Sequence, residues 1–198
     1  MIFSQKIRFK KFNEIWESKS LGEICTYKNG GSFEKEIVEN GIYNLITLNS
    51  IDIKGNLKNG HKKVNRTDKS LNKGDLVMVL SDVAHGNFLG LTAIIPDDSF
   101  VLNQRMGALK PKINVIKYYL KCIINANQKY FKLKGQGSSQ LNLSKADVEN
   151  FDLHFPSIDE QSDIANFLMT LDKKIELEMQ QLVKLKKKKK YLLSNLFV

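Results

Sequence analysis

Residues 157–197 read SIDEQSDIANFLMTLDKKIELEMQQLVKLKKKKKYLLSNLF, and from Asp159 to Phe197 there is neither glycine nor proline. A single heptad register fits this whole stretch, with its inner positions at 161, 168, 175, 182, 189 and 196 and at 164, 171, 178, 185 and 192. Eight of these eleven positions are Ile or Leu: Ile164, Leu168, Leu171, Ile175, Leu182, Leu185, Leu192 and Leu196. The pattern predicts one long helix whose apolar stripe packs against a partner helix in a coiled coil.

The ends and the charges of this stretch support the same helix. Ser157 followed by Glu160 is the spacing of a capping box at a helix start. About 40 helical residues would form a rod of roughly 60 Å. The first half carries a net charge of about −4 and the second half about +6, the latter from Lys184 and Lys186–Lys190. In an antiparallel pair the acidic half of one helix would lie along the basic half of the other, so we expect antiparallel self-association.

The preceding residues, 1–156, have the pattern of a small mixed domain. Buried strands are predicted for Leu76–Leu80, for the alternating run Leu89–Ile95 and for Phe100–Leu109. An amphipathic helix is predicted from Ile113 to Lys132, and Phe9, Phe12 and Trp16 predict an N-terminal amphipathic turn or helix. The fold class is therefore α+β: a recognition domain over 1–156 with a short sheet and packed helices, followed by one long C-terminal coiled-coil helix over 157–198.

Charge and cysteine content limit the class of protein. The formal net charge of +10 favours a polyanionic partner, with a solvated Lys-rich surface as the alternative. Cys25 and Cys122 are far apart in the sequence and are expected to be reduced. No apolar run approaches the ~20 residues of a membrane span, and Met1–Phe12 does not read as a secretory signal. We expect a soluble protein of the cytoplasm with no membrane partner.

The residues of common catalytic sites are missing from the sequence. Gly-Lys never occurs, so there is no phosphate-binding loop. His61, His85 and His154 are widely spaced and have no metal-ligand neighbours, so no metal site is expected. A nuclease needs clustered acids near a Glu-x-Lys, and the one such triplet, Glu17–Lys19, lies on the wrong side of Pro96-Asp97. The chain is expected not to be an enzyme.

Three segments together resemble the specificity subunit of type I restriction-modification systems. The first leads from Ile7-Arg8-Phe9 through Trp16 to Leu21-Gly22-Glu23-Ile24, and the second joins Lys73–Met78 to Leu102–Arg105. The third is the most specific, since it resembles the family's P...EQ..IA..L..LD pattern. It comprises Gly135–Gln140, Pro156, Glu160-Gln161, Ile164-Ala165, Leu168, Leu171-Asp172 and the Leu- and Lys-rich end up to Phe197.

The resemblance implies a target-recognition domain that enters the DNA major groove and a helix that spaces two such domains and docks methyltransferase (M) subunits. It also implies that the chain itself holds no cofactor. Methyl transfer from S-adenosylmethionine and the ATP- and Mg-dependent steps would belong to M and restriction (R) subunits. Typical members carry two recognition domains, whereas this sequence has one. It is either a half-subunit that forms an antiparallel homodimer or a fragment of a longer subunit.

Direct readout of DNA needs polar and cationic side chains on loops. The expected base-reading residues come from three loops: Ser81, His85 and Asn87; Asn103, Gln104 and Arg105; and Gln136, Ser138 and Gln140. Lys62, Lys63 and Arg66 are expected to bind phosphates. Arg105 is the first choice for a base contact, because bidentate pairing of Arg with guanine is the commonest specific contact. Tyr130 and Phe131 are expected to pack in the core, with stacking on an extruded base as the alternative.

Two other functions remain open. A stand-alone dimeric DNA-binding or architectural protein would also need a basic domain and a dimer-forming helix, and it would not purify with a methyltransferase. A catalytic nuclease, the less favoured reading, would show metal-dependent cleavage by the chain alone.

Overall fold

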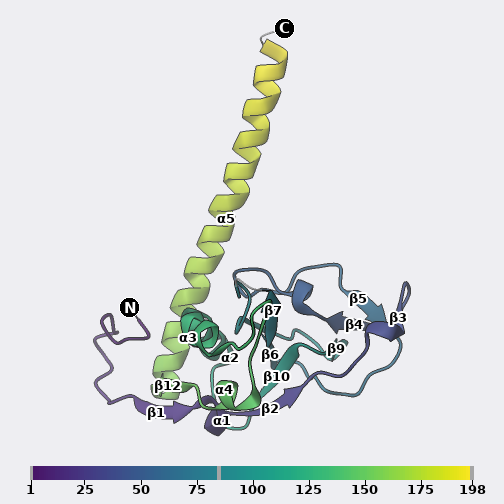
Figure 1. The fold of residues 1–198 in the computed structure, drawn as a ribbon. Helices are drawn as coiled ribbons and strands as arrows, with labels where there is room; N and C mark the ends of the chain where they lie inside the picture. Colours follow the sequence, from purple (N-terminus) through teal and green to yellow (C-terminus); the bar gives the residue numbers. More distant parts are fainter. Residues whose placement is uncertain (1, 84–85, 197–198) are drawn as a thin grey trace.

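The computed structural model describes residues 2–83 and 86–196 and shows a domain of short strands and helices from which one long helix projects (Figure 1). The long helix, α5, runs from Ile158 to Leu196 and ends far from the strands. The α+β class and the C-terminal helix predicted from the sequence are confirmed.

The central sheet is antiparallel and has the order β2-β10-β6-β8. Its strands are β2 (Cys25–Asn29), β10 (Met106–Pro111), β6 (Leu76–Val79) and β8 (Thr92–Ile94). All four residues of β6 are buried, as the continuous apolar run predicts for a strand covered on both faces. The strand expected over Leu89–Ile95 is shorter in the structure, although the alternating residues Leu89, Leu91, Ala93 and Ile95 are all buried.

A second sheet has the order β3-β5-β4-β9, and β4 and β9 pair in parallel. Its strands are β3 (Ile37–Val38), β5 (Lys62–Val64), β4 (Tyr43–Ile46) and β9 (Phe100–Leu102), with short 3₁₀ turns at Glu34–Glu36 and Leu48–Ser50. The single strand expected over Phe100–Leu109 was wrong. The chain turns at Asn103–Arg105, where Arg105 has φ of +71°, and passes from β9 in this sheet to β10 in the central one.

Two small sheets close the domain. In the first, β1 (Glu17–Ser20) pairs antiparallel with β12 (Asp152–Phe155), which brings the two ends of the domain together. In the second, β7 (Ser81–Val83) pairs antiparallel with β11 (Gln140–Asn142).

Four shorter helices pack around the sheets: α1 (Leu21–Ile24), α2 (Lys117–Ala126), α3 (Gln128–Lys134) and α4 (Lys145–Glu149). The one helix expected over Ile113–Lys132 is therefore two helices, which meet at Asn127. The side-chain amide of Asn127 donates to the carbonyl oxygen of Ile123 at 2.8 Å and so occupies a backbone acceptor at the end of α2.

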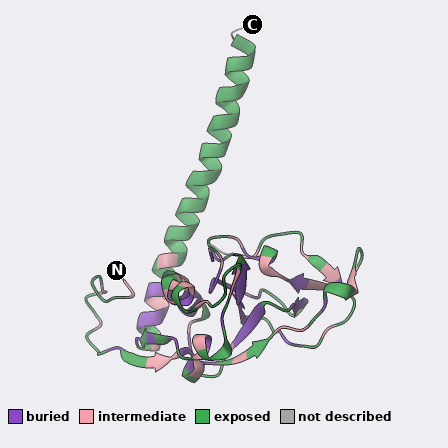
Figure 2. Ribbon diagram, viewed as in Figure 1, coloured by how far each residue is buried: buried purple, intermediate pink, exposed green. Residues whose placement is uncertain are grey.

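One apolar cluster lies between the central sheet and the helices, and two others involve the second sheet. In Figure 2 buried residues are seen in both sheets, whereas α5 has them only at its base. Tyr119, Leu120, Ile123 and Ile124 of α2 are buried in the first of these clusters, as the helical spacing predicts. Phe131 is also buried, and the ring of Tyr130 lies 4.8 Å from that of Phe151. The expected core role of these two aromatic residues is confirmed.

The N-terminal segment forms turns rather than a helix and lies against the base of α5. Trp16 is only 6% exposed, as expected for a core residue. Its indole Nε1 donates to Glu160 Oε2 at 3.0 Å, and Arg8 holds both carboxylate oxygens of Glu160 at 2.7 and 2.8 Å. The first turn of α5 is therefore fixed to the segment that precedes β1 by a buried carboxylate with three donors.

This arrangement changes the expected cap of α5. The backbone amide of Glu160 does reach Ser157 Oγ, at 3.5 Å. The Glu160 side chain does not complete a capping box, because Arg8 and Trp16 take its carboxylate. The Ser157 hydroxyl makes one of the two bonds of a capping box, and Glu160 instead joins the first turn of α5 to Arg8 and Trp16.

Candidate nucleic-acid interface

The three polar loops selected from the sequence meet around one residue, Leu80. Its backbone amide donates to the carbonyl oxygen of Arg105 at 3.0 Å, and its own carbonyl accepts from the amide of Leu143 at 2.8 Å. Leu80 directly precedes β7, and β7 pairs with β11. The turn 103–105, the described part of the loop after β7 and the segment 136–142 therefore lie next to one another, although Leu80 and Leu143 are 63 positions apart.

The turn between β9 and β10 presents two side chains and buries a third. Gln104 and Arg105 are exposed, and the left-handed backbone of Arg105 is uncommon for a residue other than glycine. Asn103 is only 2% exposed. Its Oδ1 accepts from the amide of Phe33 at 3.2 Å and its Nδ2 donates to Glu34 Oε1 at 3.3 Å, so this side chain holds the turn in place and does not face solvent.

Ser81 and Gln140, expected in different loops, are bonded to each other across β7 and β11. Gln140 Nε2 donates to Ser81 Oγ, and Ser81 Oγ donates to Asn142 Oδ1 at 2.6 Å. Ser81 is 3% exposed. This side chain therefore ties the two strands together, and the exposed polar groups nearby belong to other residues.

Those exposed groups lie on the loop that the sequence places at Gly135–Ser139. The backbone of Gln136 exchanges hydrogen bonds of 3.0 and 2.9 Å with Asn142, which closes a tight turn. Gly137 has φ of +125°, and a Cβ there would lie 2.0 Å from the carbonyl oxygen of Gln140, so only glycine fits. The side chains of Gln136 and Ser138 are left exposed.

The loop after β7 is closed by Asp82. Its carboxylate accepts from the backbone amides of Val83 at 2.8 Å and Phe88 at 2.7 Å. Asn87 is exposed, while its carbonyl oxygen accepts from Gln128 Nε2 at 2.7 Å. His85, also expected to read DNA, lies outside the described residues.

The expected phosphate-binding cations lie on or just beyond β5, in the second sheet. Lys62 is exposed and Lys63 half-buried. Arg66 is not a free cation, because its Nε donates to Glu36 Oε2 at 2.7 Å and its guanidinium lies 4.8 Å from the Phe33 ring. Hydrogen bonding from Arg66 lowers the pKa of the Glu36 carboxyl, so the pair is ionised near neutral pH.

Sequence reasoning missed two exposed residues beside the turn 103–105. Lys28 and Asn29 end β2, and Asn29 pairs with Gly107 at the start of β10. The signal was present in the run Asn29-Gly30-Gly31, since Asn-Gly after a strand marks a turn. A Cβ on Gly30 would lie 2.0 Å from the carbonyl oxygen of Asn103, which shows how closely this turn approaches the next one.

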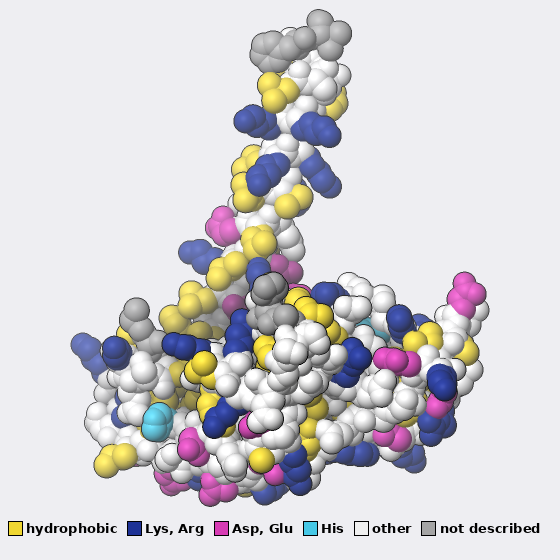
Figure 3. Space-filling view, viewed as in Figure 1, with side chains coloured by type: hydrophobic (Ala, Val, Ile, Leu, Met, Phe, Trp, Pro, Cys, Tyr) yellow, Lys and Arg dark blue, Asp and Glu magenta, His cyan; other side chains and the backbone are white. Residues whose placement is uncertain are grey.

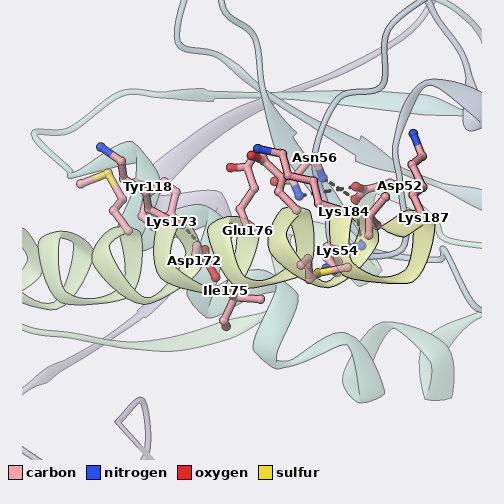
Figure 4. A pocket seen from close by; sticks show the side chains of 14 residues that line it. Asp52, Lys54, Asn56, Tyr118, Asp172, Lys173, Ile175, Glu176, Lys184 and Lys187 are labelled. Carbon is pink, nitrogen blue, oxygen red and sulfur yellow. Dashed lines mark hydrogen bonds between the residues drawn. The ribbon is translucent and has the colours of Figure 1, made fainter. Parts of the chain in front are cut away.

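A groove with a volume of about 1060 Å³ separates the middle of α5 from the loop between β4 and β5 (Figure 4). Asp52, Lys54 and Asn56 line it on the loop side, and Lys54 Nζ lies 3.4 Å from Met179 Sδ. At its inner end the Tyr118 hydroxyl donates to the Asp172 carboxylate. Its charges are mixed, so it lacks the positive lining expected of a DNA channel.

The apolar stripe of α5 divides into a buried start and an exposed remainder. The prediction that Ile164 packs in a coiled coil was wrong, because Ile164 is 1% exposed and lies in the core of its own domain. Leu168 packs against the same core. The other six stripe residues are 40–68% exposed: Leu171, Ile175, Leu182, Leu185, Leu192 and Leu196. Figure 3 shows hydrophobic side chains along the projecting helix, interleaved with Lys toward its end.

The acidic start of α5 is also partly used within the chain. Glu160 binds Arg8, and Asp163 Oδ2 lies 2.5 Å from Lys11 Nζ. Beyond residue 165 the remaining acids are Asp172, Glu176 and Glu178. The charge contrast between the two halves of the free helix is therefore smaller than the sequence indicates.

Within residues 2–83 and 86–196, no three His, Cys, Asp or Glu side chains are grouped so that they could hold a metal ion. In that same part of the chain, no helix is both long and apolar enough to cross a membrane.

Comparison with known proteins decides the family. The family model of the type I restriction modification DNA specificity domain matches residues 13–187. The chain belongs to this family. A curated member, the type I restriction enzyme HindI specificity subunit of Haemophilus influenzae, is 24% identical in an alignment of 176 residues that covers 83% of this chain and 37% of the relative.

Solved structures of type I restriction-modification proteins share the fold at 15–17% identity. The S subunit from M. genitalium matches with a TM-score of 0.65 over 91% of this chain and 45% of that one. The HsdS subunit from Thermoanaerobacter tengcongensis matches with 0.65 over 86% and 40%, and a chain from a type I complex-assembly structure with 0.70 over 91% and 44%. The chain thus spans less than half the length of these specificity-domain relatives.

Proposed function

We propose that this chain is the DNA sequence-specificity subunit of a type I restriction-modification complex and reads one half of a bipartite target. The observation that carries the proposal is the convergence of three polar loops around Leu80. Membership of the specificity-domain family over residues 13–187 supports it and disfavours the stand-alone DNA-binding protein.

Base reading is assigned to the exposed side chains of this surface. They are Arg105, Gln104, Asn87, Gln136 and Ser138. An Arg side chain can pair with O6 and N7 of guanine, and Gln or Asn with N6 and N7 of adenine. Asn103, Ser81 and Gln140 hold the backbone on which these side chains stand.

Phosphate contacts are assigned to Lys62 and Lys63 and, next to the turn, to Lys28. Arg66 is bonded to Glu36, and Lys28 Nζ lies 3.8 Å from Asp68 Oδ2, so each contributes less to phosphate binding than an unpaired cation would. Such contacts orient the domain on DNA but carry no sequence information.

The catalytic steps are assigned to partners. Methyl transfer from S-adenosylmethionine would belong to methyltransferase subunits, and ATP- and Mg-dependent restriction to restriction subunits. The relatives described above are subunits of type I restriction systems, which supports such partners. A role on cellular DNA implies a cytoplasmic location.

Self-association completes the proposal. Two copies paired through α5 in antiparallel orientation would present two identical recognition domains related by a two-fold axis. The target would then be a palindromic bipartite sequence with an unread spacer. The exposed stripe from Leu171 to Leu196 supports the pairing, because a stripe of this length is unfavourable in water.

Genome-wide methylation mapping of the source strain, with and without this gene, tests the function. We expect a bipartite methylated motif that is lost on deletion and restored by the gene in trans. A methylome unchanged by deletion, in a strain that expresses the chain, would overturn the proposal. A gene carrying Arg105→Gly provides a matched control, since it keeps the protein but removes one reading side chain.

A further inference from the structure

The two charged residues of the α5 stripe lie where one pairing of two helices would place them together. Between Leu171 and Leu196 the inner heptad positions are apolar except for Glu178 and Lys189. Both are exposed in the single chain. A charge at an inner position of a coiled coil weakens it unless an opposite charge faces it, so these residues restrict how two copies can pair.

In a parallel pair each residue faces its own copy. Glu178 would face the second Glu178 and Lys189 the second Lys189, which places like charges together twice. The parallel orientation is therefore disfavoured by the stripe itself, independently of the net charge of each half.

In an antiparallel pair the two helices run in opposite directions, so the residue numbers of any two facing inner positions add up to the same value. When Glu178 faces Lys189, the other facing pairs are Leu182 with Leu185, Ile175 with Leu192 and Leu171 with Leu196. Every apolar residue then meets an apolar residue, and both charges are matched. The two-fold axis gives the dimer two such Glu-Lys pairs, one on each side of the central leucines.

The two neighbouring antiparallel registers leave Glu178 and Lys189 without an opposite charge. Moving the helices by one heptad in one direction sets Glu178 against Leu182 and Lys189 against Leu171. The opposite shift sets Glu178 against Leu196 and Lys189 against Leu185. Each leaves four unpaired charges per dimer against apolar side chains, which costs more than a matched pair.

We propose that Glu178 and Lys189 fix the register of an antiparallel pair of two copies of this chain, each Glu178 facing Lys189 of the second copy. The proposal rests on the self-association in the proposed function and adds the residues that align it. In this register the two Ile158 positions are separated along the axis by the rise of 51 residues, about 75 Å at ~1.5 Å per residue. Glu178 and Lys189 therefore also set the distance between the two DNA-reading domains.

Charge reversal on the full chain tests the register, with the dimer dissociation constant measured by sedimentation equilibrium. Glu178→Lys or Lys189→Glu alone places like charges at both mixed positions, and we expect each to weaken the dimer by about tenfold or more. The double variant E178K with K189E restores two opposite-charge pairs, so its dissociation constant should return to near the original value. Glu176→Lys is the matched control, since it makes the same charge change outside the stripe and should leave the constant nearly unchanged.

These measurements distinguish the proposed register from the self-association on which it rests. Single variants that dimerise as well as the original, or a double variant that stays weak, would overturn the register and leave self-association standing. An original chain that remains monomeric would overturn both, while methylation mapping still tests DNA reading separately. Circular dichroism on every variant confirms that α5 remains helical.

Disulfide trapping gives a second measurement. In a variant with Ile175→Cys and Leu192→Cys, which keeps Glu178 and Lys189 in place, mild oxidation should join position 175 of one chain to position 192 of the other, and peptide mapping by mass spectrometry identifies the linkage. Linkages of 175 to 175 and 192 to 192 would show a parallel pair and overturn the proposal. Cys25 and Cys122, already in the chain, are identified by the same mapping.

Discussion

The backbone amide of Leu80 donates a hydrogen bond to the carbonyl oxygen of Arg105 at 3.0 Å. This bond joins the end of a central strand to the turn in which Arg105 has φ of +71°. The turn is thus held by the core while its side chain faces solvent. Such rigid support is what a base-reading side chain needs, because recognition depends on a fixed position relative to the base edge.

Replacing Arg105 by glycine should weaken sequence-specific DNA binding without lowering the stability of the fold. Glycine adopts the positive φ without strain, so the melting temperature should stay within a few degrees or rise. Loss of the guanidinium should weaken binding to the methylated motif by about 1–3 kcal/mol and relax specificity at one position. Binding measured by fluorescence anisotropy on motif and mismatched duplexes checks both effects. Lys112→Ala, at the other end of β10, is the control, and equal losses in the two variants would exclude base reading by Arg105.

Sequence patterns identified this region only in part. Polar runs pointed to the segments around residues 81–88, 103–105 and 136–140, and the described parts of these segments lie together around Leu80. They could not show that Ser81 bonds to Gln140 and Asn142, since these bonds depend on the pairing of β7 with β11, two strands that are far apart in the sequence. Nor could they tell a reading side chain from one that holds the backbone, because Asn103 and Gln104 look alike until burial is known.

For α5 the sequence predicted the helix itself but not the residues that pack against it. Local periodicity predicted its length well, because an uninterrupted heptad pattern depends on neighbours in sequence. The same periodicity assigned Ile164 to a partner helix, whereas the partner is the domain core. An apolar stripe indicates that something covers it but does not identify what does.

Ser81→Ala should destabilise the domain and act on DNA only through that effect. The change leaves Gln140 Nε2 and Asn142 Oδ1 without their partner, but both can turn to water because Gln140 is half-buried and Asn142 is exposed. We expect a loss of about 0.5–1.5 kcal/mol in the free energy of unfolding, the net value of a hydrogen bond, measured by urea denaturation. Ser138→Ala, in an exposed position, should cost almost nothing in stability. If Ser81→Ala unfolds like the original chain, the proposed structural role is wrong.

Glu160→Ala should loosen the base of α5. Its carboxylate is the acceptor for Arg8 and Trp16, and a buried ion pair that loses one partner leaves the other unsatisfied. The free energy of unfolding should fall by about 3 kcal/mol. Trp16 fluorescence should change as the indole Nε1 loses its acceptor. Glu14→Ala, nearby and exposed, serves as the control and should leave both quantities unaltered.

Both thiols should react slowly in the folded chain. Burial raises the pKa of Cys122 from 9.0 to about 11 and that of Cys25 to about 12. At pH 8 the thiolate fraction of Cys122 is then about a hundredth of that of an ordinary thiol, so alkylation by iodoacetamide should be slower by a similar factor. The rate should rise with pH up to the folded pKa and reach ordinary values in urea. Rapid labelling of Cys122 at pH 8 would contradict the raised pKa of this half-buried thiol.

Removing one heptad from α5 should shorten the unread spacer of the target. Deleting residues 179–185 brings Glu178 and Lys189 seven positions closer and keeps the stripe on the same face of the helix. With both pairs re-formed, the two domains approach by about 10 Å at ~1.5 Å per residue, which corresponds to about three base pairs at ~3.4 Å each. Methylation mapping in cells that carry only the shortened gene should find the same half-sites with a spacer about three base pairs shorter. The same half-sites with an unchanged spacer would show that α5 does not set the distance between the reading domains. If α5 positions both domains, removing two of its turns must bring the domains closer together.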